Sequence, residues 1–166
     1  MEGWHDFFVA QAGAAVAFAG LVLVSISINL ERIIKAPGLV GRSAEPLVIL
    51  FSLFVASSLL LVPDQSTRAY GLELLALAIA FSIAILVVLR TQRAAIEKAG
   101  TRGPAPRSSF PARAGLCGIT AALLLAAGTV TALGHERGVF LMLPAVISGF
   151  LLAFLDAWVL LIEIDR

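Results

Sequence analysis

Apolar residues fill five long stretches of the chain, and short polar segments separate them. A run of this kind, about as long as the ~30 Å hydrocarbon core of a bilayer requires, is typical of a membrane-spanning α-helix. The segments between the runs contain the proline, glycine and charged residues that end helices. We therefore predict five spans, at residues 7–30, 47–62, 70–89, 114–133 and 138–163.

The polar segments predict how these helices are connected. Residues 31–45 form a polar connection with a Pro-Gly turn signal, after which Ser43 can cap the second span and Pro46 fits its first turn. The third helix is expected to continue past its apolar part to Lys98, because the residues there are good helix formers. The connector between the third and fourth spans covers about residues 90–113. Its first part continues the third helix, and its proline-rich part is irregular.

Composition supports a membrane protein. Hydrophobic residues make up 60% of the chain and charged residues 14%, whereas soluble domains have ~25% charged residues. No internal repeat suggests a duplicated half. The sequence thus predicts an all-α, integral membrane bundle of five transmembrane helices that forms a single domain over residues 1–166.

Basic residues predict the orientation of the bundle, since cytoplasmic connections carry an excess of Lys and Arg. Nine of the twelve Lys and Arg lie in or beside the connections after the first and third spans: Arg32, Lys35, Arg42, Arg90, Arg93, Lys98, Arg102, Arg107 and Arg113. The N-terminus is therefore expected outside and the C-terminus in the cytoplasm. Short loops and small size favour a bacterial plasma (inner) membrane.

Asp156 is the main candidate for a functional residue, because a carboxylate inside a membrane span is costly and usually has a role. Helical spacing places it on one flank with Ser148, Leu152 and Glu163. Arg32, Arg90 and Arg113 bound spans on the same side and can extend toward Asp156 or Glu163. Two interpretations stay open, a buried ion pair that stabilises the bundle and a proton or cation site in a conduction path.

The first span adds polar residues at helical spacing, namely Gln11, Ser25 and Asn29, which form a seam for hydrogen bonds between helices or for a substrate path. Two ladders of small residues favour close helix packing in lipid. They are Gly13, Ala17 and Gly20 in the first span, and Ala145, Gly149, Ala153 and Ala157 in the last.

Other residues invite simpler interpretations. Cys117 is expected to be a small packing residue. Trp4, Phe7, Phe8 and Tyr70 fall where interfacial aromatic anchors are common. His5 and His135 carry no metal-binding spacing, so we predict no metal site and no cofactor.

The sequence contains no phosphate-binding loop, nucleophile elbow or zinc-binding motif, so an enzyme is not expected. Two functional classes remain. The first is an accessory or scaffold subunit that packs against itself or other membrane subunits. The alternative is a small oligomeric ion or proton channel or transporter that uses Asp156 and the polar seam. The expected partners are the lipid bilayer and other membrane subunits, with no nucleic acid.

Overall fold

The computed structural model describes residues 2–35, 39–99 and 110–158, and every regular element among them is helical. The described residues form five long helices, one short α-helix and two 3-10 helices. In chain order the elements are η1 (Glu2–Trp4), α1 (His5–Ile28), α2 (Leu30–Lys35), α3 (Leu39–Leu60), α4 (Thr67–Ala99), α5 (Phe110–Ala132), η4 (Glu136–Leu141) and α6 (Met142–Trp158).

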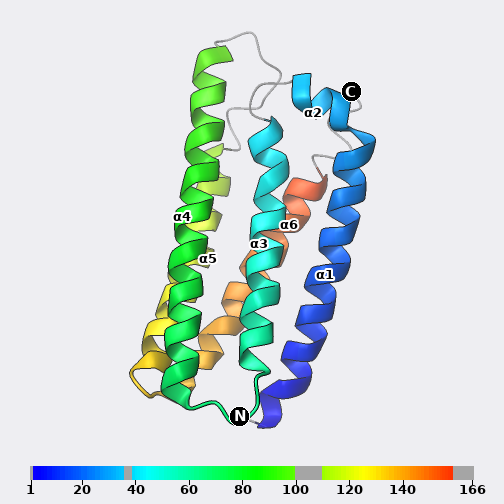
Figure 1. The fold of residues 1–166 in the computed structure, drawn as a ribbon. Coiled ribbons are helices and arrows are strands. Elements are labelled where there is room, and N and C mark those ends of the chain that lie inside the picture. Colours follow the sequence, from blue (N-terminus) through cyan, green and yellow to red (C-terminus); the bar gives the residue numbers. More distant parts are fainter. Residues whose placement is uncertain (1, 36–38, 100–109, 159–166) are drawn as a thin grey trace.

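The long helices run alternately up and down in one bundle, so α1 begins at one end and α6 ends at the other (Figure 1). α3 and α6 occupy the middle, α4 and α5 pair on one side, and α1 lies at the edge against α3. We refer to the end that holds α2 as the α2 end. The starts of α3 and α5 and the ends of α4 and α6 lie there as well.

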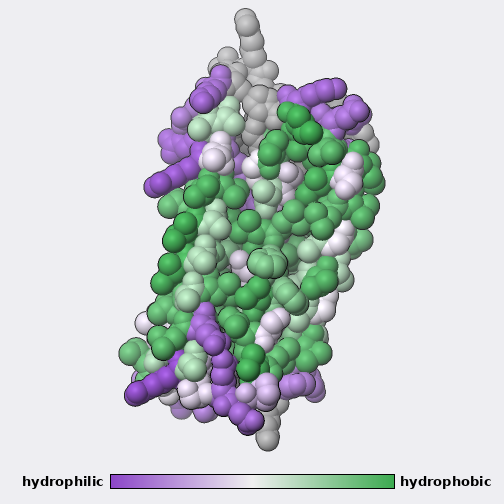
Figure 2. Space-filling view, viewed as in Figure 1, coloured by the Kyte–Doolittle hydropathy of each residue, from purple (hydrophilic) through white to green (hydrophobic). Residues whose placement is uncertain are grey.

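The surface of the bundle is divided into zones. Hydrophilic residues gather at its two ends, and a wide hydrophobic belt lies between them (Figure 2). Each of the five long helical segments, α6 being counted with η4, is long and apolar enough to cross a membrane. The prediction of an all-helical chain with five such helices is confirmed, and these helices suggest a membrane protein.

Several helices begin earlier than the sequence pattern predicts. α3 starts at Leu39, so Arg42, Ser43 and Glu45 are helical and Ser43 does not cap a helix start. Pro46 lies inside α3, where it removes one backbone donor without ending the helix. Arg42 and Glu45 have buried partners on other helices, and this tertiary packing favours a helix that begins ahead of Pro46.

The fourth span also begins earlier than the sequence predicts. α5 starts at Phe110, one turn before the predicted span, so Arg113 belongs to the helix. The continuation of α4 beyond its apolar part is confirmed as far as Ala99. Residues 100–109 of the connector and 159–163 of the last span lie outside the described residues.

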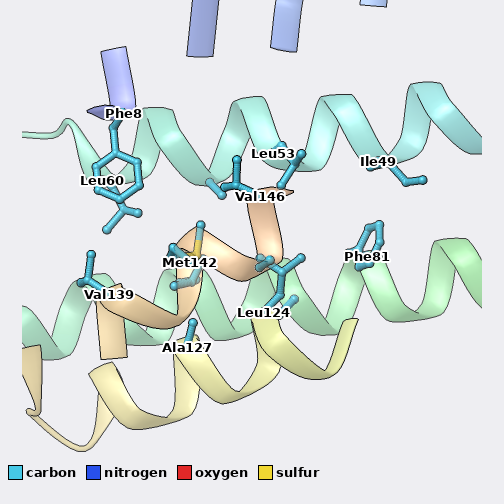
Figure 3. Packing of buried hydrophobic residues seen from close by; sticks show 14 of the residues in the cluster. Phe8, Ile49, Leu53, Leu60, Phe81, Leu124, Ala127, Val139, Met142 and Val146 are labelled. Carbon is cyan, nitrogen blue, oxygen red and sulfur yellow. The ribbon is translucent and has the colours of Figure 1, made fainter. Parts of the chain in front are cut away.

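The apolar core runs along the axis of the bundle, where α3, α4, α5 and α6 meet. Its side chains come from all five long helices and from η4, as Figure 3 shows for Phe8, Phe81 and Met142. These three are at most 2% exposed. Burying a large apolar side chain contributes roughly 1.5–3 kcal/mol relative to water, so this core defines how the helices face one another.

α4 and α5 approach most closely at two glycines away from the α2 end. A methyl group at Gly71 would overlap the backbone of Thr131 and Ala132. One at Gly128 would lie 2.7 Å from Cα of Leu75. Only glycine permits this backbone separation, and neither residue was predicted to have such a role.

Tyr70 is not an interfacial anchor as predicted. It is 6% exposed and its hydroxyl donates to the carbonyl of Leu60, in the last turn of α3. The hydroxyl thereby satisfies one of the carbonyls that a helix end leaves without a partner. Trp4, Phe7 and Phe8 do form an aromatic group near the start of α1, and Phe140 of η4 joins it.

Candidate functional site

Asp156 lies near the end of α6 and faces the inside of the bundle. Its exposed fraction is 0%. The α6 helix places it on the same face as Leu152 and Ala153, which are also fully buried. A carboxylate held there needs compensating charge, because removing an ion from water costs several kcal/mol.

Two arginines provide that charge. Nε of Arg113, in the first turn of α5, lies 2.9 Å from Oδ1 of Asp156. Nε of Arg42 on α3 lies 3.8 Å from the same oxygen. Arg113 was one of three arginines predicted to reach Asp156. The other two, Arg32 and Arg90, are exposed, and Arg42 was not predicted because it was assigned to a connection.

Glu45 on α3 is a second buried carboxylate that sequence reasoning missed. Its exposed fraction is also 0%. Arg113 donates to its Oε2, as does Nε2 of Gln92 on α4 at 2.8 Å. The thiol of Cys117 donates to Oε1 at 3.2 Å. Cys117 therefore has a polar partner and is more than a packing residue.

A signal for Glu45 was present in the sequence. Arg42 and Glu45 are three positions apart, the spacing of neighbours on one helix face. Pro46 hid it, because a proline favours a helix that starts beside it and both residues lie before that position.

We call these six residues the charge cluster. They come from four helices and meet at the α2 end: Arg42 and Glu45 from α3, Gln92 from α4, Arg113 and Cys117 from α5, and Asp156 from α6. Their two arginines balance their two carboxylates, so the cluster has no net charge. The arginines are 8% and 9% exposed, which leaves the whole cluster nearly closed to solvent.

The two carboxylates differ in how their oxygens are satisfied. Both oxygens of Glu45 accept hydrogen bonds. Neither oxygen of Asp156 has a hydrogen-bond partner among the described residues. Nε of Arg113 is near enough to Asp156, but its N–H is not directed at the oxygen. Asp156 is therefore held chiefly by its ion pairs with Arg113 and Arg42, whereas Glu45 also accepts well-directed hydrogen bonds.

Three polar residues of the first predicted span donate hydrogen bonds outside the cluster. Nε2 of Gln11 donates to the carbonyl of Leu53 on α3 at 3.2 Å. The Ser25 hydroxyl donates to the carbonyl of Leu21 at 2.9 Å, and Asn29 Nδ2 donates to that of Ser25 at 3.2 Å. The Gln11 bond joins α1 to α3, while the other two are local to α1.

The two ladders of small residues have different surroundings. Ala145, Gly149, Ala153 and Ala157 are all buried. A methyl group at Gly149 would lie 3.0 Å from Leu53 Cδ1 on α3, which shows how closely α6 packs there. Gly13, Ala17 and Gly20 are exposed on α1. Because they are exposed, a close helix contact at these residues would involve another chain, and it stays a prediction.

The remaining candidates add little to the site. Glu163 lies outside the described residues. His5 lies 3.4 Å from Asp6 in an exposed pair at the start of α1. Over residues 2–35, 39–99 and 110–158, no three His, Cys, Asp or Glu side chains are grouped to hold a metal ion. A cavity of about 170 Å³ near Trp4 and Phe140 lies far from the cluster, beside Glu136 and Arg137.

Comparison with known proteins provides no relative: no family model, curated protein or solved structure matches the chain. The description therefore rests on the fold and the cluster. They define a helical bundle with five helices apolar enough to cross a membrane and a neutral, buried charge cluster at one end.

Proposed function

We propose that this protein is an accessory or scaffold subunit of a membrane assembly, with no catalytic activity of its own. It packs against a second copy or another membrane subunit through the exposed face of α1. Its location is the bacterial inner membrane, with the N-terminus outside and the C-terminus in the cytoplasm.

The observation that carries the proposal is the composition of the exposed α1 face. Ala10, Gly13, Ala14, Ala17 and Gly20 follow one another at helical spacing, and all five are exposed. Nothing in the described chain lies within 4 Å of a methyl group placed at either glycine. Small residues permit close helix contact in lipid, where packing and not hydrophobicity drives association.

The exposed face of α4 provides a contrast within the same molecule. It consists of large aliphatic residues such as Leu72, Ile79 and Ile83, which are 48–60% exposed. Such side chains suit contact with lipid tails. α1 also exposes large aliphatic residues, most of them in its second half: Val9, Val16, Leu21, Leu23, Val24 and Ile28. The contrast with α4 therefore concerns the stripe of small residues in the first part of α1, which we propose as the surface that contacts protein.

The charge cluster supports the same proposal. Its charges compensate one another, it joins four helices, and its acids are closed to solvent. Arg113 is the centre of the arrangement because it contacts both carboxylates. An internally joined bundle of this kind is suited to act as a rigid partner in an assembly.

The test is to enlarge the α1 face without disturbing the fold. Replacing Gly13 and Gly20 together with Val is expected to reduce the size of the assembly recovered in nanodiscs, measured by light scattering and by cross-linking in native membranes. The matched control is the Ala76→Val, Ala80→Val pair on α4, the helix proposed to face lipid, where both alanines are exposed. An assembly that is unchanged by the α1 pair contradicts the proposal.

A second candidate, an oligomeric ion or proton channel, is favoured by one observation. Asp156 is a fully buried carboxylate within a helix that is apolar enough to cross a membrane, and acids in such positions often belong to ion or proton pathways. Proton or cation flux into liposomes that is lost in Asp156→Asn, with stability retained, would favour the channel. Equal flux in liposomes with and without protein would leave the scaffold proposal in place.

A further inference from the structure

A cavity of about 170 Å³ lies between η1 and η4, at the end of the bundle opposite the α2 end. Its lining residues are Trp4, Glu136, Arg137, Val139 and Phe140. The volume is below the ~300–1,000 Å³ of sites that enclose a drug-sized ligand. The cavity therefore suits a small group, such as the polar head of a larger molecule.

The apolar part of the cavity is held in place by its neighbours. Val139 is 1% exposed and belongs to the core, where it lies near Phe8 and Leu60 (Figure 3). The Trp4 ring packs edge to face with Phe140, at 5.0 Å between ring centroids, and stacks on Phe8 at 5.9 Å. Side chains of α1 and η4 thus position an indole, the aromatic group that attracts cations most strongly.

Two opposite charges line the same cavity without neutralising each other. Glu136 and Arg137 are neighbours in η4, and both are exposed. Adjacent residues of a helix project in different directions. Neither side chain has a hydrogen bond or ion pair within residues 2–35, 39–99 and 110–158. The cavity thus offers a ligand one cationic and one anionic partner, beside an indole.

Large apolar side chains continue from the cavity along α6. Phe140, Leu143 and Ile147 recur at steps of three and four residues, and they are 61%, 41% and 59% exposed. This spacing places them in one row on the outside of the bundle. A molecule whose head lies in the cavity can therefore extend an acyl chain over this row.

The charges around the cavity disfavour a purely anionic ligand. Asp6, Asp64 and Glu136 are exposed at this end, where the exposed arginines among the described residues are Arg68 and Arg137. An anionic head group would contact Arg137 but would also lie beside Glu136. A head group that carries both a phosphate and an ammonium gives each of these two residues a partner of opposite charge.

We propose that this cavity binds the head group of a phospholipid that carries a primary ammonium. Arg137 contacts the phosphate, Glu136 and the Trp4 ring contact the ammonium, and an acyl chain lies along Phe140 and Leu143. A primary ammonium donates charge-assisted hydrogen bonds to a carboxylate, which a trimethylated ammonium cannot do. The inference does not rest on the proposed function, since the small residues of α1 do not line the cavity.

Trp4 is a natural reporter of this site. The chain has two tryptophans, and the other, Trp158, is 53% exposed at the α2 end. Trp158→Phe leaves Trp4 as the reporter, and the matched control Trp4→Phe leaves Trp158. Each protein is placed in phosphatidylglycerol nanodiscs with a minor fraction of brominated phosphatidylethanolamine, phosphatidylcholine or phosphatidylglycerol, because bromine quenches tryptophan fluorescence on contact.

We expect the relative binding constant at Trp4 to be at least about threefold higher for phosphatidylethanolamine than for the other two lipids, because its head group pairs with both charges. Quenching of Trp158 should not distinguish the lipids.

Substitutions in the Trp158→Phe protein test the assigned contacts. Glu136→Gln should remove the preference for phosphatidylethanolamine, and Arg137→Gln should reduce it. Asp64→Asn and Arg68→Gln, which change exposed charges at the same end, should leave it unchanged. All four side chains are exposed, and the lipid comparison in the unsubstituted cavity stands without these variants.

Each other outcome overturns the inference. Equal quenching of Trp4 by the three lipids means that the cavity contacts only bulk lipid, and the same preference at Trp158 means that it is not a property of the cavity. A preference that is unchanged in Glu136→Gln or in Arg137→Gln contradicts the assigned contacts. Glycerophosphoethanolamine, the same head group without acyl chains, should not relieve the quenching at the concentration of the brominated lipid. Full relief would assign the cavity to a soluble ligand. The oligomer measurement with the α1 variants is independent of these results.

Discussion

At the scale of single residues, Arg113 is the side chain on which the cluster depends. Its guanidinium contacts Glu45 of α3 and Asp156 of α6, while its own backbone belongs to α5. A planar group with several donors can serve two carboxylates at once, which a lysine ammonium cannot do with the same geometry. Without Arg113, both acids would stay buried with only Arg42 as a counter-charge.

Arg113→Gln is therefore expected to destabilise the bundle by about 3–5 kcal/mol, the usual cost of leaving a buried charge unpaired. Arg113→Lys should fall between this variant and the wild type. The measurement is the free energy of unfolding in mixed micelles under denaturing detergent. The control is Arg93→Gln, which removes an exposed pair with Glu97 and should change stability by less than about 1 kcal/mol. Equal stability of the Arg113 and Arg93 variants would contradict the assigned role.

At the scale of helices, the contact between α4 and α5 depends on close approach of their backbones. Gly71 and Gly128 leave no space for a side chain between these helices. Gly118, which is also on α5, has nothing within 4 Å of an added methyl group. The same residue type on one helix thus has a structural role on one face and none on another.

Gly128→Leu is expected to force α4 and α5 apart, and Gly118→Leu should be tolerated by the fold. Overpacking of a tight contact costs about 1–3 kcal/mol or more. The readouts are the unfolding free energy and the helix content in detergent. If both leucine variants unfold at the same denaturant concentration, the helices do not approach as closely as described.

At the scale of the molecule, the two polar ends and the hydrophobic belt define how the bundle can lie in a bilayer, but not which end faces the cytoplasm (Figure 2). The basic residues bear on that choice. Arg42 and Arg113 proved to be buried partners of carboxylates, so they contribute less to the bias than exposed loop residues do. Arg32, Lys35, Arg90, Arg93 and Lys98 are exposed and still lie at the α2 end.

We therefore expect the α2 end to face the cytoplasm. A green fluorescent protein fused to the C-terminus should fluoresce, and alkaline phosphatase at the same position should be inactive. Changing the five exposed basic residues to Gln should weaken this preference, whereas Arg68→Gln at the opposite end should not. Active phosphatase on the wild-type C-terminus would reverse the orientation.

The sequence alone determined the five helices and identified Asp156 as a residue that needs a partner. Both conclusions rest on local information, since a long apolar run favours a helix in lipid and a charge within it stands out. It also placed Ala145, Gly149, Ala153 and Ala157 on one face of a helix, by spacing alone.

Only the tertiary structure decided what that face and that carboxylate meet. Glu45 is 68 positions from Arg113 and 72 from Cys117, and no local pattern encodes such pairings. Packing of α3 against α4 and α6 places Arg42 and Glu45 in the interior, in a helix that begins ahead of Pro46. The close approach at Gly71 has the same origin. Local composition predicts which segments become helices, but their partners depend on how side chains from distant segments fill a shared interior.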